Sequence, residues 1–194
     1  IRAPGGLATL VRGVDATVAA TPDGHGDTEL ARTTELLPVS PPEGGARNAQ
    51  VASVALLAVA NELAAADPET PRATWLAEQL DRRLVGWLDA TGPAGPDRNE
   101  ASRIRQRTLA LRAAARNSVG PDGARLRSIA SEDPSVAVRT AAIEALAARA
   151  TPADGASAAL EETVAWLRSR RGSEPDASVR RQIDVWLDRL DPGR

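Results

Sequence analysis

The side chains that could carry chemistry in this chain are few. There is one histidine, His25, and no cysteine, lysine or tyrosine, so aspartate and glutamate are the main acid–base groups. The lack of cysteine also excludes disulfides, thiolate metal sites and thiol nucleophiles. No GxSxG nucleophile elbow, glycine-rich phosphate loop or histidine–carboxylate metal motif occurs. This inventory favours a non-catalytic protein that carries no cofactor.

One short stretch, residues 23–29, places potential metal ligands on alternate residues. Calcium loops use alternating oxygen ligands, a turn at a glycine and a bidentate glutamate at a fixed distance. Here His25 stands where an oxygen is needed, and no glutamate lies at that distance. We therefore expect a capped loop without metal, with calcium bound by Asp23, Asp27 and Glu29 as the weaker alternative.

Arginines gather in residues 98–128, which carry eight of them against two acids. Residues 1–97 carry seven arginines against 13 acids, and the whole chain has a net charge of −2. The overall balance therefore gives no argument for nucleic acid, but the local excess could steer an acidic protein, a phosphate or a nucleic acid. The absence of lysine beside abundant alanine, glycine and proline is typical of a GC-rich bacterial genome.

The positions of these arginines on a helix divide them into two groups. At about 100° per residue, one flank of the apolar stripe carries Arg105, Arg112 and Arg116, and the other carries Arg103 and Arg107. Arginines beside a stripe can also be solvated and simply cover the edge of the core with their stems. The candidate partner surface consists of Arg103, Arg105, Arg107, Arg112, Arg116, Arg125 and Arg127.

Four tryptophans are the only aromatic residues. Trp87, Trp166 and Trp186 lie on or beside apolar stripes, and Trp75 lies at the start of a predicted helix, beside a stripe. An exposed tryptophan could anchor a partner protein, but packing in the core or at its edge is the favoured interpretation.

The elements that would hold these residues are helices. Hydrophobic residues make up 42% of the chain, many of them alanine, and the absence of phenylalanine and tyrosine leaves few strand formers. From residue 46 onward we expect three consecutive antiparallel helix pairs and one unpaired helix at the end. The spacing of apolar residues and the proline–glycine breaks predict helices over 1–20, 27–37, 46–66, 72–90, 99–116, 124–130, 134–149, 156–171 and 177–190.

The helix predicted at 46–66 is the most apolar. Val54, Leu57 and Val59 recur with so many alanines that almost no polar face remains. A helix that is apolar all round is usually buried, so we expect neighbours on several of its sides.

The sequence pattern of residues 133–146 is repeated in residues 176–187. Val138-Arg139 corresponds to Val179-Arg180 at an offset of 41 residues, which is a typical length for a two-helix repeat. Leu146 corresponds to Leu187 at the same offset, so both are expected to be buried between stacked helices.

These features resemble the HEAT and HEAT-like repeat family, whose phrase is an Asp-Pro turn, then Val-Arg, then small and apolar residues. The resemblance is clear over residues 131–190, loose over 46–130 and absent over 1–45. It implies an all-α, α–α superhelical fold: a HEAT-like α-solenoid of antiparallel helix pairs over 46–194, after a divergent helical N-terminal extension with a Pro/Gly-rich linker. By similarity, a polar ladder between repeats would use Asp133, Arg139, Asp176 and Arg180, and Ile104-Arg105 would echo Val-Arg.

The function implied is a protein–protein interaction scaffold or an accessory subunit of a larger assembly, with a protein partner that could be acidic. The alternative is a nucleic-acid-binding or DNA-glycosylase-like HEAT protein that uses the arginine-rich residues 98–128. The longest apolar run, residues 51–60, is too short to cross a bilayer, so a soluble protein is expected. The chain contains no methionine, so a signal peptide could have been removed and the compartment stays open.

Overall fold

The computed structural model describes residues 45–90, 100–151 and 158–191, and these consist of helices and turns without any strand. The prediction of an all-α protein is confirmed for this part of the chain. Each helix bound differs by at most two residues from its predicted range, whereas the helices predicted at 1–20 and 27–37 lie outside the described residues. The helices are α3 (Gly45–Ala65), α4 (Pro71–Ala90), α5 (Glu100–Asn117), α6 (Gly123–Glu132), α7 (Val136–Ala150), α8 (Ala158–Ser173) and α9 (Ala177–Leu190).

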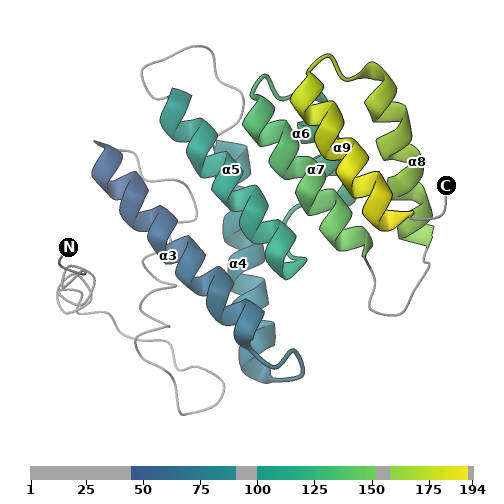
Figure 1. Cartoon of the computed structure of the whole chain (residues 1–194). Helices are drawn as coiled ribbons and strands as arrows, with labels where there is room; N and C mark the ends of the chain where they lie inside the picture. The colour runs from purple at the N-terminus through teal and green to yellow at the C-terminus, as the bar shows by residue number, and fades with distance from the viewer. Residues whose placement is uncertain (1–44, 91–99, 152–157, 192–194) are drawn as a thin grey trace, which may run out of the picture.

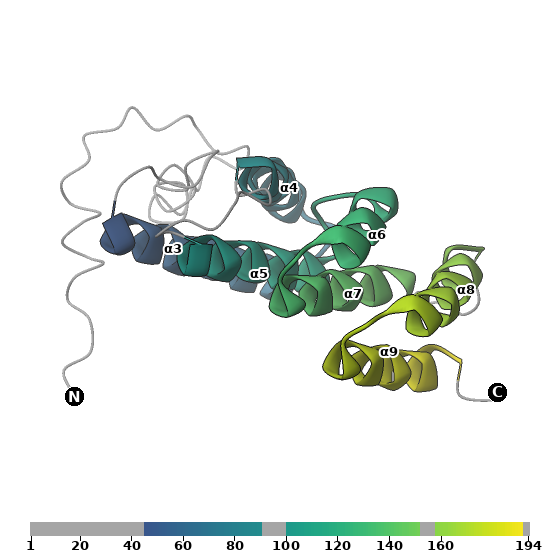
Figure 2. The same ribbon diagram turned by 90° about the horizontal axis from the view of Figure 1, so that it is seen from above.

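The helices lie in two layers (Figures 1 and 2). The first layer contains α3, α5, α7 and α9 side by side, and the second layer contains α4, α6 and α8. Neighbours within the first layer pack directly on one another. The second-layer helices pack on the first layer and hardly approach one another.

The helix pairs are out of phase with the sequence prediction. We expected α5 to pair with α6, but the backbones of these two helices hardly approach each other and only side chains such as Leu111 and Ile129 meet between them, whereas α6 packs extensively on α7 and α8 packs closely on α9. The turns explain the difference, because only the three residues 133–135 separate α6 from α7 and a comparable short turn separates α8 from α9. The last helix, α9, is therefore paired with α8, whereas the predicted packing of α3 on α4 is present and α4 also packs on α5.

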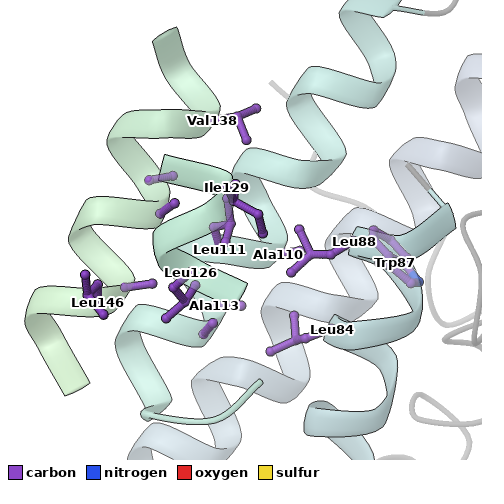
Figure 3. Packing of buried hydrophobic residues seen from close by; sticks show 14 of the residues in the cluster. Leu84, Trp87, Leu88, Ala110, Leu111, Ala113, Leu126, Ile129, Val138 and Leu146 are labelled. Atoms are coloured by element: carbon purple, nitrogen blue, oxygen red, sulfur yellow. The ribbon is translucent and has the colours of Figure 1, made fainter. Parts of the chain in front are cut away.

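The core fills the space between the layers, and Figure 3 shows its central part. Leu111 of α5 lies beside Ile129 of α6, and Trp87 of α4 is completely buried, as its place on an apolar stripe predicts. Many core positions are alanine, which lets the first-layer backbones approach closely. Leu146 is buried as predicted, but Leu187 is only partly buried because α9 is the last helix of its layer.

The expectation that α3 is buried on several sides is wrong. Val54 is 40% exposed and Leu57 is 38% exposed, although Leu56 and Val59 on the opposite side are fully buried. The described elements cover α3 with α4 and α5 only, because it is the first helix of its layer. Apolarity alone could not show that no described element covers one face of this helix.

The turns before α7 and α9 repeat the same hydrogen bonds at an offset of 41 residues. Asp133 Oδ1 accepts from the N–H of Ser135 at 2.8 Å, and Glu174 Oε1 accepts from the N–H of Asp176 at 3.0 Å. The counterpart of Asp133 is therefore Glu174, and not Asp176 as the sequence comparison suggested. Asp176 instead caps α9, and its pKa is lowered by hydrogen bonds from the Ser178 hydroxyl and from the N–H groups of Val179 and Ser178.

The arginine of each Val-Arg phrase completes its own turn. Arg139 Nη1 donates to the carbonyl oxygens of Asp133 at 2.9 Å and Pro134 at 3.3 Å. Arg180 Nη1 donates to the corresponding carbonyl oxygens of Glu174 at 2.7 Å and Pro175 at 2.8 Å. The sequence repeat and the hydrogen bonds share one offset. The turns of the two helical hairpins, α6–α7 and α8–α9, are therefore stabilised by the same set of hydrogen bonds.

Buried ion pairs link one hairpin to the next. Arg139 of α7 reaches Glu174 before α9 at 2.9 Å, and Arg107 of α5 pairs with Asp133 before α7. The sequence comparison matched Ile104-Arg105 with the Val-Arg pattern. In the structure, however, Arg105 is exposed, and the buried contact is made by Arg107, two residues further along. The ladder predicted from Asp133 and Arg139 exists, with Glu174 as its second acid.

Candidate binding groove

The outward face of α5 carries a stripe of arginines. Arg105, Arg112 and Arg116 are exposed, and their spacing of seven and four residues places them on one side of the helix. The opposite side of α5 packs into the core through Ala110, Leu111 and its neighbours. The sequence of α5 therefore fixes which arginines face solvent.

Beside this stripe, the first layer is hollowed into a groove of about 500 Å³. All four first-layer helices contribute residues to it. This matches the packing, because neighbouring helices approach more closely in the first layer than in the second. The lining residues are Leu57, Ala60 and Asn61 of α3, Leu109, Arg112, Ala113, Ala115 and Arg116 of α5, Glu144 and Ala148 of α7, and Trp186 of α9.

The groove combines apolar surface with charges that are not neutralised. Arg112 and Arg116 make no ion pair with any residue in the described ranges, and neither does Glu144 across the groove on α7. The small side chains of Ala113 and Ala148 leave the space between these polar groups. Such a mixture of an apolar floor and a polar rim is the usual anatomy of a protein-binding surface.

The α9 side of the groove is formed by Trp186. Its ring is half-buried, and the guanidinium of Arg189 lies 5.0 Å from the ring centre, a cation–π contact that adds another positive charge at this edge. The indole N–H is buried and has no acceptor among the described residues. The preceding residue of α9, Val185, is 43% exposed.

The other candidate arginines do not join this surface. Arg107 is only 6% exposed and is held by Asp133, so its inclusion in the partner surface is corrected. Arg125 and Arg127 of α6 form ion pairs at 2.8 Å with Asp89 of α4 and at 2.9 Å with Glu162 of α8.

These α6 pairs tie second-layer helices that do not pack on one another. Arg103 is half-buried on the other flank of α5 and has an interaction of its own. The structure therefore gives six of the seven arginines one of three roles: Arg107 forms a buried ion pair, Arg125 and Arg127 link second-layer helices, and Arg105, Arg112 and Arg116 form an exposed stripe on the first layer.

Sequence reasoning missed the groove residues outside α5. Leu57, Glu144 and Trp186 come from three helices and share no sequence pattern. The one available signal was the unusually apolar α3, whose Val54 and Leu57 are 40% and 38% exposed. For the tryptophans, packing in the core or at its edge is confirmed, since Trp75, Trp166 and Trp186 pack partly buried against the core.

The possible calcium ligands Asp23, Asp27 and Glu29 lie outside the described residues. Within the described ranges, no group of three or more His, Asp or Glu side chains is placed to hold a metal ion. Among the same residues, no helix is long and apolar enough to cross a membrane.

The most deeply buried carboxylate, Glu174, has structural partners. Burial opposes its ionisation, but the N–H of Asp176 and the guanidiniums of Arg139 and Arg170 outweigh burial and lower the pKa of Glu174. Glu174 is 3% exposed and faces these cations in the turn before α9, away from the groove lining. Glu174 therefore has a structural role, as an acid of the polar ladder that joins the hairpins.

We predict that acid weakens this ladder. Because the folded-state pKa of Glu174 lies below its unfolded value of about 4.3, its contribution to stability is complete at neutral pH and is lost as the pH falls through the folded-state pKa. The urea midpoints of the wild type and the Glu174→Gln variant should therefore differ most at neutral pH and converge as the pH falls below the unfolded value and through the lower folded-state pKa. A difference between the two proteins that stays constant over this range would contradict the assignment.

Comparison of the chain with protein-family models, with curated proteins and with solved structures found no match.

Proposed function

We propose that this chain is a HEAT-like helical-repeat protein that binds a partner protein across its first layer and acts as a non-catalytic scaffold or accessory subunit. The observation that carries the proposal is the groove shared by α3, α5, α7 and α9, with exposed apolar residues and unneutralised arginines. The repeat of sequence and hydrogen bonds at 41 residues supports the solenoid architecture. Stacked helix pairs of this kind offer long continuous surfaces for partners.

The groove chemistry supports binding better than catalysis. Among the described residues of its lining, Glu144 is the only carboxylate, and no histidine, serine or threonine accompanies it. A general acid–base reaction needs a second group within hydrogen-bond reach of the reacting atoms, and this lining supplies arginine and asparagine as its other polar side chains. Arginine and tryptophan, which this lining contains in Arg112, Arg116 and Trp186, are enriched among the residues that carry most binding energy at protein interfaces.

The test uses photo-crosslinking residues placed at Leu57 or Leu109 in the groove and, as the control, at Val85 on α4. Val85 is 38% exposed, as Leu57 is, but belongs to the second layer. The proposal expects one protein crosslinked from both groove positions and not from Val85. That protein, once purified, should bind the wild type and lose affinity for a Leu57→Asp variant. Crosslinks from Val85 alone, or equal affinity for wild type and variant, would refute it.

A further inference from the structure

We infer that the groove takes an amphipathic helical segment of the partner, with an apolar stripe and an acidic flank that lies along α5. This inference rests on the proposed function, because it names the chemistry of the partner at the same site. Three features of the groove support it: the charge of the rim, the apolar floor, and the mode of peptide recognition that such a surface allows.

The rim of the groove is positive on the α5 side and negative at one point on α7. Arg105, Arg112 and Arg116 extend for about 17 Å along α5, at 1.5 Å per residue. Arg112 and Arg116 are one helical turn apart, which is also the spacing of two carboxylates at positions i and i+4 of a partner helix. Glu144 on the far side repels such carboxylates, so the acidic flank is directed toward α5.

The floor of the groove is complementary to apolar side chains of a partner. Leu57, Ala113, Ala148 and Trp186 give it a hydrophobic surface that neither phosphates nor a solvated acidic chain would cover. A helix with leucine-type residues at spacings of three and four presents one apolar stripe to such a floor. Its acidic flank would then face the arginines without any rearrangement of the described backbone.

The alternative modes of peptide recognition lack their structural basis here. Addition of a strand needs an open sheet edge, and the described ranges contain no strand. Recognition of a polyproline segment needs several aromatic side chains in one groove, and Trp186 is the single aromatic residue that the described part of the chain contributes to this lining. A second copy would place arginine stripe against arginine stripe in a two-fold contact, which like-charge repulsion opposes. Helix-in-groove recognition is the mode that remains.

The experiment is a selection from a displayed library of helical segments of about five turns, with leucines fixed at spacings of three and four. The flanking positions are randomised among Glu, Gln and Lys. Clones are selected on the wild type, and retained clones are then compared on Arg112→Gln/Arg116→Gln. The matched control is Arg125→Gln/Arg127→Gln, which removes the same charge from the second layer.

The inference expects enriched clones with Glu at i and i+4 on one flank of the leucine stripe. A purified clone should bind the Arg112→Gln/Arg116→Gln variant about tenfold more weakly, and the α6 control within about twofold of the wild type. Its association rate with the wild type should fall as salt screens the exposed charges. An unchanged urea midpoint for the Arg112→Gln/Arg116→Gln variant confirms that the effect is not unfolding, since neither arginine has a described ion-pair partner.

Four results would overturn the inference. Two concern the clones: enrichment of neutral or basic flanks, and equal binding to the wild type and the Arg112→Gln/Arg116→Gln variant. The other two are duplex DNA that binds the groove more tightly than any clone, and self-association of this chain that occludes Leu57. If the crosslinked partner still binds through Leu57 and Leu109 in these cases, the proposed function stands and only the acidic helical segment is wrong. If no partner crosslinks there, the proposed function itself fails.

Discussion

Replacing Glu174 with alanine is expected to lower the free energy of unfolding by about 3–5 kcal/mol, because it leaves the buried guanidinium of Arg139 without its counter-charge. The same substitution removes the acceptor for Arg170 and for the N–H of Asp176, so the turn before α9 loses three contacts together. Equilibrium unfolding in urea, followed by far-ultraviolet circular dichroism, measures the loss.

Two variants make this result specific. Glu174→Gln keeps an acceptor for the N–H of Asp176 but removes the charge, so its loss should be smaller than that of Glu174→Ala. Asp89→Ala breaks the exposed pair with Arg125 and should cost about 0–1 kcal/mol. If Glu174→Ala were no more destabilising than Asp89→Ala, Glu174 would not link the two hairpins.

Replacing Leu111 with alanine is expected to cost about 2–5 kcal/mol, as truncation of a fully buried leucine does when the core cannot collapse into the space. Leu111 projects from α5 toward α6 and α7, at the centre of the packing between the layers (Figure 3). Its loss therefore weakens the packing of α5 against both helices.

The matched control is Leu57→Ala, which makes the same chemical change at a position that is 38% exposed. We expect it to cost well under half as much stability as Leu111→Ala, because much of the side chain already contacts water. For binding of the crosslinked partner the order should reverse, with Leu57→Ala losing affinity and a folded Leu111→Ala retaining it. Similar stability losses for the two variants would contradict the burial of Leu111 or the exposure of Leu57.

Local patterns in the sequence predicted the helices well, for physical reasons that particular residues illustrate. Pro134 after Asp133 ends one helix and starts the next, and the structure places residues 133–135 between α6 and α7. The spacing of Val138, Ala142 and Leu146 predicted the buried face of α7. These features depend on residues only a few positions apart, so the sequence contains them directly.

The polar ladder was predicted less well, because its partners are distant in the sequence. Alignment of Asp133 with Asp176 followed residue type, whereas the backbone places Glu174 at the equivalent point, as the shared hydrogen bonds show. Likewise Arg105 matched the Val-Arg phrase, but the side chain that reaches Asp133 is that of Arg107. A contact across 26 residues is decided by the packing angle of two helices, which the local phrase does not contain.

The groove could not be predicted at all from one helix at a time. The arginine stripe on α5 was predicted from spacing, but its neighbours Leu57, Glu144 and Trp186 come from α3, α7 and α9. These residues meet because alternate helices of the chain lie side by side in one layer. That arrangement depends on the packing of all the described helices and not on any one of them. The apolar outer face of α3 was the clearest sign, and it was interpreted as burial in the core.

The most direct test of the account is hydroxyl-radical footprinting of this chain, free and in complex with the partner identified by crosslinking. The account predicts that Leu57, Leu109 and Trp186 become protected in the complex, since they line the groove of the first layer. Val85 on α4 should keep the reactivity that it has in the free chain. Protection of Val85 and its second-layer surroundings, with Leu57, Leu109 and Trp186 as reactive as before, would contradict the central claim that partners bind in this groove.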